Sequence, residues 1–170
     1  MWKDKRVFVT GANGFLGSHL TKNLFKREAK VFALIYEPIK GSIFDEENQS
    51  NEVTVINGNV CNMSLMKKTL LDNKIEVVFH LAALIAIPYS YHSPDSYIDT
   101  NIKGTLNVIQ AARDLNIERV LVTSTSEIYG TAQYVPIDEK HPKQPQSPYS
   151  ASKIGSDCMA DSFYRSFDMP

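Results

Sequence analysis

A tyrosine and a lysine four residues apart, Tyr149 and Lys153, are the residues whose types and spacing first suggest catalysis. A spacing of four places both side chains on one face of a helix, one turn apart. A free tyrosine has a pKa of about 10 and is a poor base near neutral pH, but nearby positive charge favours the phenolate. Tyr149 is therefore a candidate to take a hydroxyl proton while a hydride leaves the same carbon. The alternative is a plain surface pair on an amphipathic helix.

A glycine-rich segment supplies the second chemical signal. Residues 10–17 read Thr-Gly-Ala-Asn-Gly-Phe-Leu-Gly, between an apolar run and a helical pattern. In such loops the first glycine permits a tight turn, the second admits a pyrophosphate, and the third lets helix and strand pack closely. The helix start offers N–H groups to the phosphates. The segment predicts dinucleotide binding, with a ligand-free glycine turn as the alternative. Its candidate contacts are Gly11, Asn13, Gly14, Phe15, Leu16 and Gly17.

The end of the second expected strand bears on the choice between nicotinamide dinucleotides. An acid at this place, roughly 20 residues after the glycines, holds the adenosine ribose. Here the strand end is Tyr36, and Glu37 follows one or two places late. Lys40 is the only nearby basic residue that could hold a 2′-phosphate. We therefore expect NAD rather than NADP.

The elements that must position these residues alternate between strand and helix. This order, with nearly continuous apolar strands, predicts a Rossmann-like α/β fold with a doubly wound parallel sheet. We expect one domain over residues 1–170. The expected strands are 6–10, 31–36, 53–57, 77–80 and 119–123. The expected helices are 14–27, a helix capped by Asn62 or Ser64 and ending near residue 71, a long helix from Ser93 to about residue 114, and 148–167, capped by Ser147.

Two further patterns complete this outline. The long helix from Ser93 carries one apolar stripe, made of Ile98, Ile102, Leu106, Ile109 and Ala112. Residues 38–52 and the proline-rich residues 131–148 read as loops.

Composition excludes several classes of protein. Lys and Arg total 18 and Asp and Glu total 19, and this net charge of -1 argues against a dedicated nucleic-acid binder. No apolar run reaches the ~18 residues of a membrane span, and no signal peptide opens the sequence. Cys61 and Cys158 cannot form a disulfide framework, so we expect a cytosolic protein with reduced thiols. Metal-ligand spacing is absent from the sequence positions of His19, His80, His92, His141 and the two cysteines.

Five motifs in fixed order resemble a known family. They are Gly11–Gly17, HLAA at 80–83, NIKGT at 101–105, STSEIYG at 124–130 and YSASK at 149–153. Together they resemble the extended short-chain dehydrogenase/reductases, specifically the NAD-dependent epimerase/dehydratase family that acts on nucleotide sugars. Residues 81–97 and 123–153 are most similar to the 4,6-dehydratases of nucleotide-linked N-acetylglucosamine in legionaminic-type pathways.

The resemblance implies an NAD site beyond the glycine loop. An Asp after the third strand usually contacts the adenine amino group, and Asn59-Val60 holds that place here. An Asn carbonyl can still accept that hydrogen bond. The remaining implied cofactor residues are Tyr36, Leu81, Ala82, Ala83, Asn101, Thr123, Tyr149 and Lys153. For Ala82 and Ala83 the alternative is ordinary packing, and for Asn101 it is an ordinary polar position on a helix.

The resemblance also implies catalytic roles for Thr125, Ser126 and Glu127, with a polar strand cap as the alternative. Thr125 bonds the sugar O4. In 4,6-dehydratases the triplet is usually Thr-Asp-Glu, and the Asp protonates the departing C6 hydroxyl. Ser126 is a far weaker acid, so either Glu127 acts as base and then as acid, or the reaction needs no such acid. Nucleotide-glucuronate decarboxylases of the family also carry Thr-Ser-Glu, which leaves decarboxylation, or 4-epimerisation, as the alternative.

The implied cycle begins when Tyr149 deprotonates O4 as a hydride passes from C4 to NAD. The 4-ketone acidifies the C5 proton, which Glu127 removes as water leaves from C6, and the hydride then returns to C6. Family members are usually much longer than this chain. Their remaining part carries a sixth strand and a small domain that binds the nucleotide sugar, so a non-catalytic dinucleotide-binding module is a further alternative.

The resemblance implies a homodimer through the two long helices, at about residues 95–114 and 148–167. Candidate interface positions, equally consistent with ordinary core, are Ile154, Cys158, Phe163 and Phe167.

Overall fold

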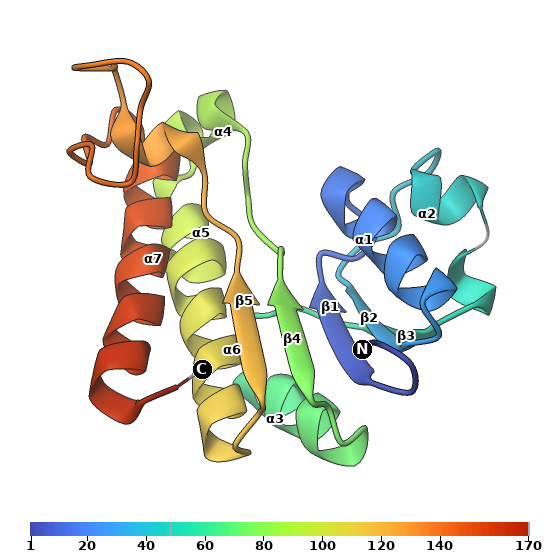
Figure 1. Ribbon diagram of the computed structural model, residues 1–170. Coiled ribbons are helices and arrows are strands. Elements are labelled where there is room, and N and C mark those ends of the chain that lie inside the picture. Colours follow the sequence, from blue (N-terminus) through green and yellow to red (C-terminus); the bar gives the residue numbers. More distant parts are fainter. Residues whose placement is uncertain (48, 170) are drawn as a thin grey trace.

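The computed structural model describes residues 1–47 and 49–169 and shows a five-stranded, fully parallel sheet (Figure 1). The strand order is β3-β2-β1-β4-β5, so the chain reverses direction across the sheet after β3. This order confirms the expected Rossmann-like α/β fold. The strands are β1 (Arg6–Thr10), β2 (Lys30–Ile35), β3 (Thr54–Asn57), β4 (Val77–His80) and β5 (Arg119–Val122).

Helices cover both faces of the sheet. They are α1 (Phe15–Lys26), α2 (Ile43–Glu46), α3 (Met63–Asp72), α4 (Ile87–His92), α5 (Pro94–Tyr97), α6 (Gly104–Asp114) and α7 (Pro148–Phe167). Figure 1 shows α1 and α2 on one side of the sheet and α3, α6 and α7 on the other. Short helical turns of other types lie at Gln49–Asn51, Ile98–Lys103 and Ser126–Tyr129.

Alternation along β1 explains this two-sided arrangement. Val7 and Val9 belong to the apolar cluster that includes Leu24 of α1. Phe8, between them, belongs to the opposite cluster with Met66 of α3. Each such fully buried side chain contributes about 1.5–3 kcal/mol of transfer free energy. The two clusters therefore fix the sheet between its helices and hold the carboxyl ends of the strands in place.

Both helix caps expected from the sequence are present. The Asn62 side chain accepts a hydrogen bond from the Leu65 N–H at 3.0 Å and begins α3, so Asn62 rather than Ser64 is the cap. Ser147 forms a reciprocal capping box with Ser150 at the start of α7, with Pro148 in the first turn.

The long helix expected from Ser93 is interrupted. A π-helical turn over Ile98–Lys103 separates α5 from α6, and the buried side chains before α6 are Tyr97 and Asn101. Ile98 is 57% exposed, so the predicted apolar stripe is wrong at this end, although Ile109 and Ala112 are buried. The reason is that polar partners bury the other face: the Tyr97 hydroxyl donates to the Ala86 carbonyl at 2.6 Å.

Other boundaries differ from the prediction. Strands β2, β3 and β5 exclude Tyr36, Val53 and Thr123, which lie in the adjoining loops. The expected loop over 38–52 contains α2, whose Phe44 is buried in the apolar cluster that includes Val7 and Val9. Helix α4 was also not expected from the sequence. Residues 131–147 have no regular helix or strand, as predicted for this described segment.

Candidate functional site

The carboxyl ends of the parallel strands bring the predicted site residues to one edge of the sheet. Thr10 pairs in register with both Leu34 and His80, and His80 pairs with Val122, so the loops after these strands emerge side by side. Open α/β sheets bind ligands at this edge, where the strand order reverses. A cleft of about 500 Å³ lies there.

The cleft brings together most of the predicted cofactor residues. The predicted residues that line it are Gly11, Asn13, Gly14, Phe15, Leu16, Gly17, Tyr36, Asn59, Val60, Leu81, Ala82, Ala83 and Thr123. Lining residues that the sequence did not single out are Leu34, Ile39, Gly58, Leu84, Ile85 and Thr100; Glu37 also lines the cleft, whereas Lys40 is not among its lining residues.

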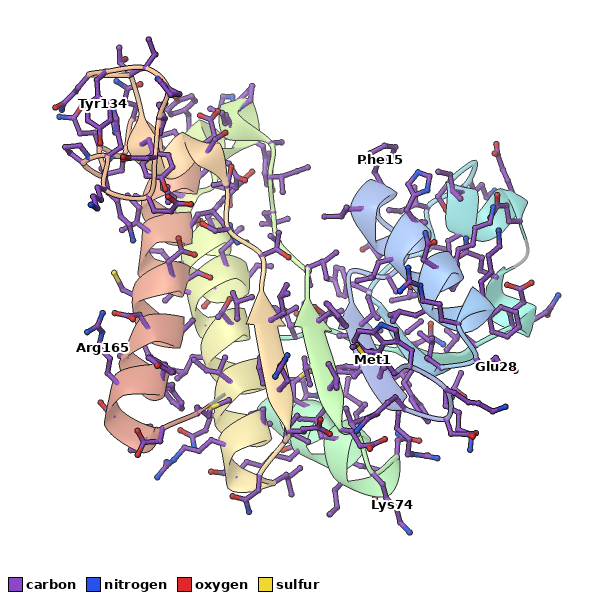
Figure 2. The ribbon with its side chains drawn as sticks, viewed as in Figure 1. Met1, Phe15, Glu28, Lys74, Tyr134 and Arg165 are labelled. Carbon is purple, nitrogen blue, oxygen red and sulfur yellow. The ribbon has the colours of Figure 1, made fainter. Side chains whose placement is uncertain are left out.

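The glycine loop has no side chain where its backbone approaches the Leu81–Ala82 segment on the opposite wall of the cleft. Gly11 has φ of +66°, and a Cβ added to it would lie 2.9 Å from the Ala82 nitrogen. A Cβ on Gly14 would lie 3.3 Å from the Gly11 carbonyl oxygen. Helix α1 then starts at Phe15, and its first three residues line the cleft. Figure 2 shows Phe15 projecting from that end of α1, and its side chain is 80% exposed.

Asn13 joins the glycine loop to the segment after β2. Its side-chain amide donates to the Glu37 carbonyl at 2.7 Å, and Asn13 is 7% exposed. This bond holds Glu37 beside the loop and leaves its carboxylate, like the Tyr36 ring, exposed at the cleft. The expected acid for a ribose is therefore at the cleft, although it does not belong to the strand.

Asn59 and Val60 form the wall after β3. The Asn59 side-chain oxygen accepts from the Cys61 N–H at 2.8 Å, which fixes the side chain and leaves its second lone pair for a ligand. The Val60 carbonyl accepts from the buried Asn107 side chain at 2.9 Å. Asn107 was not predicted, because its role depends on where α6 packs.

Asn101 lies behind the cleft rather than in its lining. Its side-chain oxygen accepts from the Leu84 N–H at 2.8 Å, and its amide donates to the Leu84 carbonyl and to Ser152 Oγ, both at 2.9 Å. At 1% exposure it holds the cleft segment around Leu84 against α7. The expected supporting role fits these contacts, whereas direct cofactor contact does not.

Tyr149 and Lys153 lie one turn apart on α7, and neither is among the residues that line the cleft. The Lys153 amine donates to the carbonyl of Thr123, a cleft residue, at 2.6 Å. Burial lowers the pKa of Lys153, and the Asp157 carboxylate opposes this shift. Tyr149 is 7% exposed and packs edge-on against Tyr97, with ring centroids 6.2 Å apart.

The Thr125-Ser126-Glu127 triplet follows β5 at the same edge. Thr125 Oγ1 accepts from the Glu127 N–H at 3.3 Å and caps the short turn that contains Ser126. The side chains of Ser126 and Glu127 are exposed, so they are free to meet a substrate. Just before the triplet, Ser124 Oγ donates to Asp157 of α7 at 2.6 Å.

The sequence analysis did not predict the contact between Ser124 and Asp157, although one feature of the sequence pointed to Asp157. Asp157 follows Lys153 by four residues and so lies on the same helix face. Its bond to Ser124 ties the triplet segment to the helix that carries Tyr149 and Lys153. The arrangement joins a phosphate-type cradle, a buried amine and an exposed carboxylate at one sheet edge.

The four candidate interface positions divide between core and surface. Phe163 is buried, Ile154 is half-buried and Cys158 is exposed. Phe167 is 46% exposed but packs within the chain, with the Arg113 guanidinium 3.7 Å from its ring centroid.

The described residues offer neither a metal centre nor a membrane-spanning helix. Residues 1–47 and 49–169 contain no group of three or more His, Cys, Asp or Glu side chains placed to hold a metal ion. No helix in the same described ranges has the length and apolar character needed to cross a membrane.

Comparison with known proteins matches nearly the whole chain. A family model described as GDP-mannose 4,6 dehydratase matches residues 8–170. The dTDP-D-glucose 4,6-dehydratase of Homo sapiens is 29% identical over 170 residues, which cover 98% of this chain and 49% of that protein.

Two solved structures show the same architecture. DesIV, a dTDP-glucose 4,6-dehydratase from Streptomyces venezuelae with NAD and TYD bound, has a TM-score of 0.87 and 28% identity, covering 96% of this chain and 53% of its own. The UDP-N-acetylglucosamine 4-epimerase from Methanobrevibacter ruminantium M1, in complex with UDP-N-acetylmuramic acid, has a TM-score of 0.87 and 32% identity, covering 98% and 53%. The chain spans about half the length of these relatives.

Proposed function

Because the chain belongs to the GDP-mannose 4,6 dehydratase family of NAD-dependent epimerases and dehydratases, we propose that it carries the NAD-binding part of a nucleotide-sugar 4,6-dehydratase. The reaction passes through a 4-keto sugar and makes the enzyme a lyase. The observation that carries the proposal is the cleft at the sheet edge, which collects the glycine loop, the Tyr36–Glu37 segment and the Leu81–Ala83 segment. Residues 1–170 then form one Rossmann domain.

The cleft fits a dinucleotide because the glycine loop, the segment after β2 and the segment after β3 all line it. A Cβ at Gly11 would meet the Ala82 backbone and one at Gly14 the Gly11 carbonyl, so glycine at both positions permits the tight loop that leads a pyrophosphate to the N–H groups of α1. Glu37 is the carboxylate available to the adenosine ribose, and Asn59 has a lone pair for the adenine amino group. An acid at the ribose disfavours a 2′-phosphate, so NAD is the proposed cofactor and NADP the weaker ligand. Held by these residues, NAD would supply a hydride acceptor for the sugar and the return of that hydride.

The chain's own residues supply proton transfer and orientation. Thr125 orients the sugar through its O4. Tyr149 takes the O4 proton, with the buried ammonium of Lys153 favouring the phenolate. Glu127, exposed beside them, removes the C5 proton that the 4-ketone has made acidic. Thr125, Glu127 and Tyr149 all lie at the carboxyl edge of the sheet, so they can act together on one sugar ring.

Ser126 bears on what happens after the 4-ketone. A serine hydroxyl is a poor acid, so Glu127, once protonated, returns its proton to the leaving C6 hydroxyl. The Thr-Ser-Glu triplet also favours nucleotide-glucuronate decarboxylation as a second candidate, in which the 4-ketone drives loss of carbon dioxide. The YSASK context at 149–153 favours dehydration.

A homodimer and a cytosolic location complete the proposal. Ile98 on the π-helical turn and Tyr164 on α7 are apolar side chains with 57% and 64% exposure, and both lie on the segments that the dimer would pair. Cys61 and Cys158 are unpaired thiols, as a reducing compartment allows.

The experiment that tests the reaction mixes NAD-loaded protein with nucleotide-linked N-acetylglucosamine and, separately, with a nucleotide glucuronate. We expect the reduced-nicotinamide signal in the wild type and its loss in Tyr149→Phe. Product mass then separates the candidates: loss of water indicates dehydratase, loss of carbon dioxide indicates decarboxylase, and an unchanged mass with altered stereochemistry indicates epimerase. NAD binding without reduction of any sugar would support the dinucleotide-binding module alone.

A further inference from the structure

A chain of buried hydrogen bonds runs from the glycine loop to α7 through one imidazole. His80, at the end of β4, is 3% exposed. Its Nδ1 lies 2.8 Å from Thr10 Oγ1, and its Nε2 lies 2.9 Å from Thr105 Oγ1. Thr10 Oγ1 also accepts from the N–H groups of Leu81 at 3.1 Å and Ala82 at 3.0 Å. One side chain thus joins β1, the cleft wall and α6.

The Thr10 end of this chain fixes the direction of the imidazole bond. A hydroxyl has two lone pairs and one proton. The Leu81 N–H, which also donates to the Thr10 carbonyl at 3.3 Å, and the Ala82 N–H occupy both lone pairs of Thr10 Oγ1, so its proton is left to bond His80. The hydroxyl therefore donates, and His80 Nδ1 accepts.

The Thr105 end gives the same answer independently. Thr105 Oγ1 donates to the Asn101 carbonyl at 2.6 Å and contacts Ser156 Oγ at 3.1 Å. Having given its proton to that carbonyl, the hydroxyl can only accept from His80 Nε2–H. Both ends therefore require the neutral imidazole with its proton on Nε2.

We propose that His80 is a positioning residue, which holds the Thr10 hydroxyl as a donor and thereby fixes the Leu81-Ala82 backbone as the cleft wall opposite Gly11. The Ala82 nitrogen would lie 2.9 Å from a Cβ on Gly11, so the two backbones nearly touch. A small shift of Leu81-Ala82 changes the width of the cleft where the glycine loop begins. The effect on cofactor affinity rests on the proposed NAD site, whereas the effect on the wall does not.

The neutral state required by this geometry agrees with the burial of the ring. Burial, aided by the positive charge of Lys153, lowers the pKa of His80 to about 3. A second ring proton would also confront the Thr10 hydroxyl, whose lone pairs are already occupied.

Two substitutions divide the functions of the ring. In His80→Asn the side-chain oxygen falls near the place of Nδ1 and keeps an acceptor for Thr10. In His80→Gln the side-chain amide falls near the place of Nε2 and keeps a donor for Thr105 while removing the acceptor at Thr10. Thr10→Val removes the hydroxyl itself and is the matched reference for loss of the wall contact.

The first measurement needs no cofactor and no variant. Nitrogen-15 NMR of the wild-type imidazole is expected to show a protonated Nε2 and an unprotonated Nδ1 at neutral pH. A proton on Nδ1 would overturn the proposal, whether or not any variant folds.

The second measurement follows hydrogen exchange of the Ala82 N–H, whose bond to Thr10 reports the wall. Exchange is expected to be about tenfold faster in His80→Gln and Thr10→Val, and within about threefold of wild type in His80→Asn. Equal exchange in His80→Gln and wild type would overturn the proposal.

NAD titration of the same proteins separates this inference from the proposed function. NAD affinity is expected to weaken in His80→Gln and to recover in His80→Asn. If wild type binds no NAD while Ala82 exchange follows the expected order, the proposed function fails and the positioning role stands. If NAD binds and His80→Gln loosens the wall without changing affinity, the claim that His80 shapes the cofactor cleft is wrong.

Discussion

At the scale of single residues, the site depends on the buried charge of Lys153 and its interaction with Asp157. Lys153 is 6% exposed, and burial lowers its pKa, while Asp157 one turn further on raises it. Asp157 is also bound by Ser124, so one carboxylate both moderates the lysine and holds the segment before Thr125. The Tyr149–Lys153 spacing was visible in the sequence. The Ser124–Asp157 contact was not, because it joins residues brought together only when α7 packs beside the segment that follows β5.

Substitution of Asp157 by Asn is expected to lower the pKa of Lys153 further, because the attraction that opposes burial is removed. Ser124→Ala is the matched control, since it breaks the same hydrogen bond and keeps the charge. Carbon-13 NMR of the Lys153 Cε, followed against pH, measures the change. An unchanged Lys153 titration in Asp157→Asn would show that the two groups are not coupled.

His80 gives the fold a dependence on pH of known sign. Its pKa is about 3 in the folded chain and about 6.5 when unfolded, so the unfolded chain binds the extra proton between these values. Its contribution to stability is complete above pH 6.5 and is lost as pH falls toward 3. Between pH 6.5 and 5 the loss is about 2 kcal/mol.

Urea unfolding at both pH values measures this loss, and His80→Asn should lack it because it has no titrating ring. The comparison is between the change in unfolding free energy with pH in each protein. A constant difference in stability caused by the substitution therefore does not affect it. Equal slopes for the two proteins would mean that His80 takes up its proton as readily in the folded chain as in the unfolded chain.

At the scale of elements, polar residues decide which helix face is buried. The aliphatic stripe predicted for the helix from Ser93 placed Ile98 inside, whereas the π-helical turn buries Asn101 instead. The spacing of aliphatic residues cannot predict the burial of a polar side chain whose hydrogen-bond partners lie elsewhere in the chain. The caps Asn62 and Ser147 were predictable because their partners are three residues away.

Replacement of Asn101 by Leu tests how much this polar anchor contributes. The change leaves the half-buried Leu84 N–H and carbonyl without their partner, and a group left unsatisfied away from water costs up to roughly 1–3 kcal/mol. Asn107→Leu is the control, since Asn107 makes one such bond, to the Val60 carbonyl. Denaturant unfolding should show the larger loss for Asn101→Leu; equal losses would mean that the Leu84 segment finds other partners.

At the scale of the whole molecule, the parallel sheet and the strand-end location of the cleft were predictable from the order of strands, helices and glycines. The buried positions of Asn101 and His80 behind the cleft were not, because their contacts join residues 51 and 25 positions apart in the chain. For the same reason, the sequence did not predict that the side chains of Ile98 and Tyr164 are exposed.

The proposed dimer makes a prediction at this scale. Ile98→Lys places a charge in the paired helices and is expected to shift the protein from dimer to monomer in analytical ultracentrifugation. Leu71→Lys, another exposed apolar side chain, on α3, is the control and should leave the dimer intact. A wild type that sediments as a monomer would contradict the proposed homodimer.

Calorimetric titration of this 170-residue chain with NAD, and with NADP for comparison, tests the central claim most directly. The glycine loop, the Glu37 segment and the Asn59 wall predict micromolar or tighter binding of NAD and weaker binding of NADP. Gly11→Ala should abolish it, since the new Cβ meets the Ala82 nitrogen and sits at a left-handed φ. Absence of NAD and NADP binding by protein shown to be folded by circular dichroism would contradict the claim that this chain holds the cofactor site.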